Sequence, residues 1–181
     1  MKIQSLKIPE IKLIKPDIYK DNRGYFYESY STEKFIDVDG QKILFVQDNQ
    51  SFSKKNVLRG LHFQKSPMAQ GKLIRVIAGE IYDVAVDLRE ASSTFGQWVG
   101  QILSGDNHLQ LWIPEGFAHG FYCLKDSLVQ YKTTSYYSPN NESTIRWDDA
   151  HLNINWPINS EPVVSSKDQQ ADHFEINQKD F

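Results

Sequence analysis

Two histidines stand in short motifs that could do proton-transfer chemistry. His62 lies in the run Val57–Gln64, which reads VLRGLHFQ, and His119 comes three residues after the tight turn that ends at Gly116. An imidazole titrates near neutral pH, so either ring can take up or release a proton under physiological conditions. Taken singly, His62 could equally be a core histidine bonded to the backbone, and His119 a surface residue after a turn. The occurrence of both motifs in one chain favours a shared polar pocket.

The positions of the neighbouring cations support such a pocket. Alternation along an extended strand puts Arg59 on one face and His62 mainly on the other, and one face of a small barrel points inward. We expect His62 on the inward face, in a polar pocket near Arg59 and Lys72.

The same motifs argue against a metal centre. A metal-binding barrel of the cupin type usually offers a His-x-His pair and a glutamate in its first motif, whereas this chain has His62-Phe63-Gln64. His62 and His119 supply two nitrogen ligands, and catalytic zinc sites use three protein ligands. A site completed by Glu80 or Asp83 is not favoured. We expect neither a metal nor a cofactor.

Without a metal, the pocket must work by general acid–base catalysis. A catalytic imidazole usually needs a carboxylate that fixes its tautomer and stabilises the imidazolium. Asp168 could partner His62 across space, but Asp83, Asp87 and Asp172 compete for that role on the sequence alone.

A tyrosine is a suitable proton donor, because a phenol with a pKa near 10 stays protonated at neutral pH. Tyr131, Tyr136 and Tyr137 all follow the second histidine motif, and the sequence leaves the choice among them open.

The composition narrows the class of protein. The formal net charge of −3 argues against nonspecific nucleic-acid binding, which depends on a surplus of Lys and Arg. No apolar stretch approaches the roughly twenty residues that span a bilayer, and the N-terminus lacks the apolar core of a signal peptide. Cys123 is the single cysteine, so no intramolecular disulfide can form. We expect a cytoplasmic protein with no nucleic-acid or membrane partner, built as one domain over residues 1–181.

Short β-rich runs separated by turn residues must position these side chains. Their spacing predicts an all-β protein, an antiparallel sandwich or barrel. One helix is expected at Thr32–Val38, a hairpin at residues 72–88, and an irregular segment after Asn159 that wraps the barrel. The expected strands are Tyr25–Tyr30, Ile43–Ser51, Val57–Phe63, Gly71–Ile77, Glu80–Asp87, Gly96–Leu103, Leu109–Ile113, Ala118–Leu124 and Ser127–Thr133.

Eight blocks of sequence form a recognisable pattern, and the two that contain Leu58–His62 and Pro114–Phe121 are highly specific together and in this order. With them the chain resembles the dTDP-4-dehydrorhamnose 3,5-epimerase family over nearly its whole length. The resemblance implies a cupin-type jelly roll (a double-stranded β-helix), a homodimer and a dTDP-linked 4-keto-6-deoxy sugar as substrate in dTDP-rhamnose biosynthesis. The blocks are Asp21–Glu28, Phe45–Ser53, Val57–Gln64, Gly71–Val76, Gly79–Arg89, Ser93–Trp98, Ile113–Phe121 and Ser166–Asp168.

The resemblance also assigns roles to individual residues. It implies that His62 is the base, Asp168 its buried partner and Tyr131 the acid on the opposite side of the sugar ring. Lys72 is similar to the lysine that stabilises the enolate oxygen, and His119 lines the same pocket. The remaining matches are substrate contacts: Arg59, Gln47 and Asn49 for the pyrophosphate and sugar, Tyr137 nearby, and Arg23, Phe26 and Glu28, which a neighbouring subunit supplies for the nucleoside.

These roles fit the chemistry of a 4-keto sugar, in which C3 and C5 both flank the carbonyl. Loss of either proton gives an enolate whose charge rests on O4, where a cation stabilises the transition state. Three alternatives stay open on the sequence: an epimerase that acts at C3 only or C5 only, a metal-dependent cupin enzyme, and a non-enzymatic cupin that binds a sugar or nucleotide.

Overall fold

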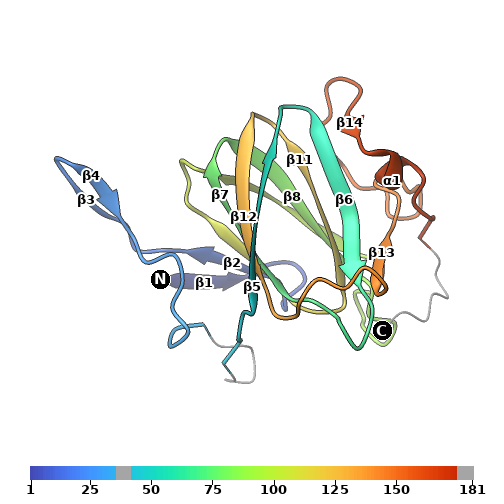
Figure 1. Cartoon of the computed structure of the whole chain (residues 1–181), viewed down its shortest axis with the longest axis horizontal. Helices are drawn as coiled ribbons and strands as arrows, with labels where there is room; N and C mark the ends of the chain where they lie inside the picture. Colours follow the sequence, from blue (N-terminus) through green and yellow to red (C-terminus); the bar gives the residue numbers. More distant parts are fainter. Residues whose placement is uncertain (36–41, 175–181) are drawn as a thin grey trace.

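Two antiparallel sheets face each other in the computed structural model of the chain (Figure 1), which describes residues 1–35 and 42–174. The first sheet has the strand order β1 (Lys2–Ser5), β2 (Lys12–Lys15), β10 (Gln110–Ile113), β7 (Lys72–Ala78), β12 (Ser127–Thr133) and β5 (Gln47–Ser53). The second has the order β13 (Glu142–Thr144), β6 (Val57–Gln64), β11 (Phe117–Cys123), β8 (Glu80–Asp87) and β9 (Trp98–Ser104), and β14 (Val163–Val164) runs parallel to β6.

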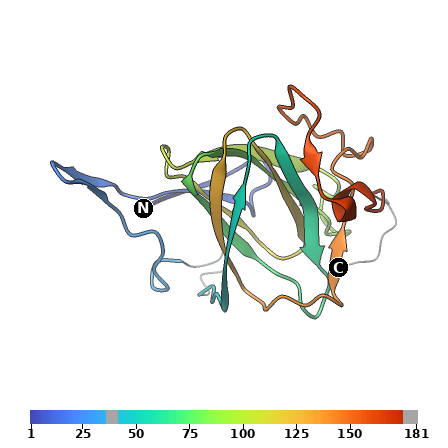
Figure 2. The same ribbon diagram turned by 45° about the horizontal axis from the view of Figure 1, so that its top comes forward.

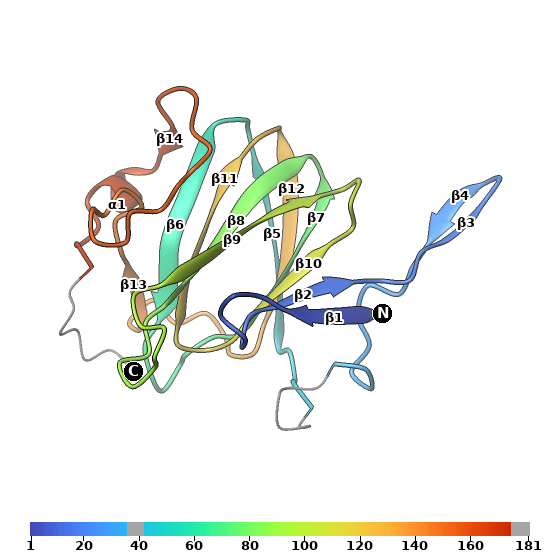
Figure 3. The same cartoon turned by 180° about the vertical axis from the view of Figure 1, so that it is seen from behind.

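The chain passes repeatedly from one sheet to the other. β5 and β7 belong to the first sheet and β6 and β8 to the second; β9 pairs with β8, and the chain then returns to β10. The view from behind in Figure 3 shows β8 and β9 lying side by side. This alternation between two packed layers is the cupin-type jelly roll, so the expected fold class is confirmed.

The hairpin expected at residues 72–88 is wrong. β7 pairs with β10 and β12, whereas β8 pairs with β11 and β9. The turn at Gly79 carries the chain across to the other sheet instead. Gly79 has a φ of +87°, and a Cβ there would lie 2.1 Å from the carbonyl oxygen of Asp126. The residue types of a turn do not reveal whether the next strand joins the same sheet.

The interior between the sheets is apolar away from the site. Ile74 and Val76 of the first sheet pack against Ile81, Ala85 and Phe121 of the second in one buried cluster. Because the cluster packs the two layers together in this part of the interior, the inward side chains elsewhere have a fixed frame on both walls.

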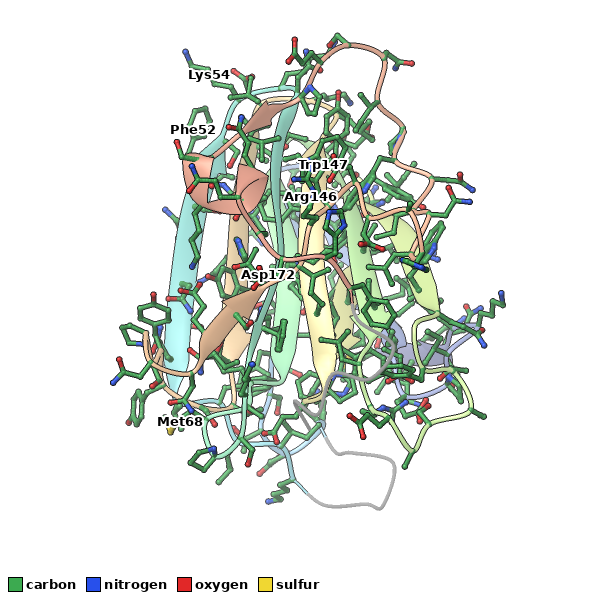
Figure 4. The ribbon with its side chains drawn as sticks, turned by 90° about the vertical axis from the view of Figure 1, so that its right-hand side faces the viewer. Phe52, Lys54, Met68, Arg146, Trp147 and Asp172 are labelled. Atoms are coloured by element: carbon green, nitrogen blue, oxygen red, sulfur yellow. The ribbon has the colours of Figure 1, made fainter. Side chains whose placement is uncertain are left out.

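The second sheet is also covered on its outer face. Val84 and Val86 point outward from β8 and are buried beneath Ile145, Leu152 and Phe174. Figure 4 shows this C-terminal segment crossing the sheet. Only Phe174 in this cover comes from the segment after Asn159. The same segment places β14 and the short helix α1 (Ser166–Gln169) against β6, so the wrapping expected for it is confirmed.

The N-terminal part includes a projecting hairpin. Within the described ranges, β3 (Tyr19–Asp21) and β4 (Gly24–Phe26) pair only with each other, and they extend away from the two sheets (Figure 2). The helix expected at Thr32–Val38 is a turn over residues 32–34, and residues 36–38 lie outside the described part.

Most expected strands are present, and two, Glu80–Asp87 and Ser127–Thr133, have the predicted bounds. The strand expected at Ile43–Ser51 begins at Gln47, and the one expected at Tyr25–Tyr30 ends at Phe26. Six elements were not predicted from the sequence: β1, β2, β3, β13, β14 and α1.

Candidate active site

A cavity of about 310 Å³ lies between the two sheets. Both walls contribute polar side chains, so the cavity is suited to a charged or hydroxylated ligand. Its lining comprises Gln47, Asn49, Ser51, Lys72 and Tyr131 from the first sheet, Arg59, His62, Phe63, Gln64, His119, Phe121 and Glu142 from the second, and Gln70 and Tyr137 from loops.

His62 is paired with a buried carboxylate. Its Nε2 lies 2.6 Å from Oδ1 of Asp168, while Oδ2 of Asp168 accepts the Gly60 N–H at 3.3 Å. Burial acts to raise the pKa of Asp168, but the hydrogen bonds from His62 and Gly60 outweigh it and hold this pKa below its usual value. The carboxylate is therefore ionised at neutral pH. With Nε2 engaged in this way, Nδ1 of His62 is left as the basic atom.

The helix that carries Asp168 is fixed by a cap. Ser165 precedes α1, and its Oγ accepts the Asp168 N–H at 3.1 Å. β14 holds the preceding residues against β6, pairing Val164 with Leu58. A residue 106 positions away in the chain from His62 is thus brought to the same strand that carries the histidine.

An irregularity in β6 brings Arg59 and His62 to the same cavity. The register pairs Phe121 with Arg59 and His119 with His62, and it shifts between these two pairs. Strict alternation, which placed Arg59 and His62 on opposite faces, is therefore wrong here. Gly60 makes the close approach feasible, since a Cβ at this position would lie 2.6 Å from the Cα of Gly120.

His119 has a carboxylate partner of its own. Its Nε2 lies 2.9 Å from Oδ2 of Asp83, and both residues are buried. Desolvation lowers the pKa of His119, although Asp83 opposes the shift. Asp83, which competed for His62 in the sequence, thus pairs with the second histidine.

Lys72 is a buried cation on the facing sheet. Its Nζ donates to the carbonyl oxygen of His62 at 3.1 Å. Desolvation lowers the pKa of Lys72 to about 8, while Asp83 and Glu142 act to raise it. At neutral pH the ammonium is still protonated, and it can donate hydrogen bonds inside the cavity.

The structure narrows the choice among the three tyrosines. Tyr131 projects from β12, on the sheet that faces His62, and burial raises the pKa of its phenol. Tyr137 also lines the cavity, and its hydroxyl donates to Oε2 of Glu142 at 2.9 Å. Tyr136 is 62% exposed and is not among the residues that line the cavity.

Three predicted site residues lie elsewhere. Arg23 and Phe26 belong to the projecting hairpin, where Arg23 donates to Asp21 at 2.6 Å. Glu28 forms an ion pair with Lys34 at 2.8 Å. None of the three lines the cavity of its own chain.

Glu142 was missed in the sequence. It lines the cavity from β13, accepts the Tyr137 hydroxyl and forms an ion pair with Lys167, which is adjacent to Asp168. Burial acts to raise the pKa of Glu142, but the bonds from Lys167 and Tyr137 prevail and lower it. The polar run around Glu142 has no strand periodicity that would have revealed its position.

No cluster of three or more His, Cys, Asp or Glu side chains in residues 1–35 and 42–174 is arranged to hold a metal ion. No helix in these ranges has the length and apolar character needed to cross a membrane.

Comparisons with known proteins agree on one family. A family profile described as dTDP-4-dehydrorhamnose 3,5-epimerase matches residues 5–175. The enzyme of that name from Salmonella typhimurium is 53% identical over 91% of this chain and 90% of its own length. The crystal structure of dTDP-6-deoxy-D-glucose-3,5-epimerase from Legionella pneumophila, in complex with dTDP-4-keto-L-rhamnose, superposes with a TM-score of 0.92. That protein is 50% identical in sequence, and the match covers 99% of this chain and 94% of that one. A structure from Bacillus anthracis with TDP and PPi bound is 46% identical with a TM-score of 0.89, covering 96% and 99%.

Proposed function

The chain belongs to the dTDP-4-dehydrorhamnose 3,5-epimerase family, and from this premise we propose how its residues invert C3 and C5 of dTDP-4-keto-6-deoxyglucose. The product is dTDP-4-keto-L-rhamnose. One observation carries the proposal: His62, backed by Asp168, and Tyr131 line a single cavity from opposite sheets. Inversion at carbon needs a base on one face and an acid on the other.

In the first step, Nδ1 of His62 removes the proton from the carbon beside the ketone. The electron pair of the broken C–H bond forms a double bond between that carbon and C4, and the π pair of the carbonyl moves to O4, which becomes the enolate oxygen. The ionised Asp168 stabilises the imidazolium that forms. Lys72 donates to the enolate oxygen, an interaction that strengthens as charge develops.

In the second step, Tyr131 delivers a proton to the opposite face of the same carbon. Its raised pKa supports this role, because the phenol is fully protonated at neutral pH. Solvent then takes up the proton that His62 gained and returns a proton to Tyr131. The same sequence repeats at the other carbon that flanks the ketone.

The same proposal assigns substrate contacts to other residues that line the cavity. Arg59 suits the diphosphate, because its planar guanidinium binds phosphate oxygens in pairs. Gln47 and Asn49, joined by a 2.8 Å hydrogen bond, present amides to the sugar and pyrophosphate. His119 and Tyr137 complete the lining around the substrate.

A second copy of the chain supplies the nucleoside contacts in this proposal. The hairpin extends away from its own body, and Phe26 is 69% exposed. Such an arm carries a guanidinium at its turn and an exposed aromatic ring on β4, and both are suited to a nucleobase in another subunit's cavity. We propose a homodimer in which Arg23, Phe26 and Glu28 act in trans. The cytoplasmic location stays a prediction.

The test is an NMR time course in D₂O with dTDP-4-keto-6-deoxyglucose. The wild-type protein should incorporate deuterium at both C3 and C5, and His62→Ala should bind dTDP while exchanging far more slowly. An absence of exchange at both carbons in the wild type would reject the proposal. Full activity after treatment with a chelator is expected, and a loss restored by a metal ion would favour a metal-dependent enzyme.

A further inference from the structure

Gln64 occupies the position at which a metal-binding cupin would carry its second imidazole, and the proposed chemistry gives it no task. It is the last residue of β6 and is only 4% exposed. Its Nε2 donates to the carbonyl oxygens of Met68 at 2.6 Å and Tyr136 at 3.1 Å. Its Oε1 accepts the Ser138 N–H at 2.8 Å. Two donors and an acceptor are thus all engaged with backbone groups.

Two of these bonds bracket one residue of the cavity wall. Gln64 bonds the carbonyl oxygen of the residue before Tyr137, which is Tyr136, and the N–H of the residue after it, which is Ser138. The N–H of Tyr137 itself donates to Oε1 of Gln47 at 3.0 Å. The peptide units on both sides of Tyr137 are therefore fixed. The Tyr137 ring leaves the backbone in one direction, towards Glu142 on β13.

The third bond joins this wall to the loop after β6. Met68 lies in that loop, at the end of the barrel away from Lys54 (Figure 4). The link is reinforced by Gln70, whose amide donates to the carbonyl oxygen of Ser135 at 2.8 Å. The two loops at this end of the cavity are thereby held together by side-chain amides.

Only an amide satisfies all three groups around position 64. A carboxylate could accept the Ser138 N–H but would face two carbonyl oxygens without a proton to offer. A neutral imidazole has one donor and one acceptor, so it leaves a buried carbonyl unsatisfied. The departure from the metal-binding pattern thus coincides with a specific task for the amide.

We propose that Gln64 is a positioning residue that fixes Tyr137 and the cavity wall around it, and so governs how tightly the nucleotide-linked substrate binds. This inference rests on the proposed function of the cavity. The dyad of His62 and Asp168 receives none of its hydrogen bonds from the Gln64 amide. Substrate affinity should therefore depend on Gln64 far more than the chemical steps do.

The experiment compares Gln64→Met, which keeps the approximate shape but removes the amide, with Gln64→Glu, which keeps only the acceptor. Gln4→Glu, on the exposed strand β1, is the control for an amide-to-carboxylate change. For both variants at position 64 we expect KM for the keto sugar and Kd for dTDP to rise about tenfold or more, with kcat within about threefold of wild type. The control should match wild type.

A double-mutant cycle with Tyr137→Ala separates positioning from a general loss of stability. If Gln64 acts through Tyr137, the double variant should bind dTDP no more weakly than Tyr137→Ala alone. Unchanged KM and Kd in both variants at position 64, or effects that multiply in the cycle, would overturn the inference. Because dTDP affinity is measured without turnover, the inference can fail while the wild type still exchanges deuterium. A wild type that shows no exchange indicates failure of the proposed function instead.

Discussion

Replacing Asp168 by Asn probes the step in which charge develops on His62. The substitution keeps the size of the side chain and removes its negative charge, 2.6 Å from the imidazole. Two unit charges about 4 Å apart interact by about 4 kcal/mol at an effective dielectric constant of about 20. The carboxylate meets a full positive charge only after proton abstraction. Since about 1.4 kcal/mol corresponds to a factor of ten, we expect kcat to fall about 10³-fold.

The assay is deuterium incorporation at C3 and C5 under saturating substrate, together with the dissociation constant for dTDP. Asp172→Asn is the matched control, because Asp172 is exposed, lies four residues further along the same segment and competed with Asp168 in the sequence. Its exchange rate should equal that of wild type. A loss below tenfold in Asp168→Asn, or an equal loss in the control, would refute the argument that this carboxylate stabilises the imidazolium.

Further predictions concern Lys72 as the cation, Tyr131 as the acid and the β3–β4 hairpin as the arm that acts in trans. Burial lowers the pKa of Lys72 to about 8, so the ammonium is protonated below this pH and kcat/KM should fall as pH rises through about 8. Lys72→Arg should shift this alkaline fall in kcat/KM to higher pH. If the fall stays where it is, it reports the titration of another group. Lys72→Met should reduce kcat by about 10²–10³. Tyr131→Phe should still incorporate deuterium at C3 but form inverted product about 10²–10⁴ times more slowly, as followed by NMR; normal inversion would exclude Tyr131 as the acid. Phe26→Ala and His62→Ala should each be nearly inactive alone, yet a refolded mixture should regain activity through mixed dimers; no recovery would contradict a contribution in trans.

An all-β sandwich or barrel could be predicted from the residues because strand periodicity and turns are local properties, whereas the jelly roll came through the family resemblance. β8 and β12 were located correctly from their own residues, Glu80–Asp87 and Ser127–Thr133. Sheet membership is not local, so the expected hairpin at residues 72–88 failed even though both of its strands exist. The short edge strand β1, whose residues are all exposed, offered no buried face to detect.

Site residues could be predicted where they belong to a sequence motif. The prediction failed where the three-dimensional arrangement of the strands decides which side chains line the cavity. The pairing of His62 with Asp168 came through the family resemblance, because no local pattern links positions so far apart. Alternation could not anticipate the register shift that brings Arg59 to the cavity that His62 lines. Glu142 was missed because its strand is three residues long and half-buried throughout.

The proposed mechanism requires His62 and Tyr131 to act on opposite faces of one sugar ring. A crystal structure of the protein with a bound, non-epimerisable dTDP-linked sugar measures this directly. We expect Nδ1 of His62 and the phenol oxygen of Tyr131 on opposite faces of C3, with Nζ of Lys72 beside the oxygen on C4. A sugar that presents the same face to both side chains, or that lies outside the cavity between the two sheets, would contradict it.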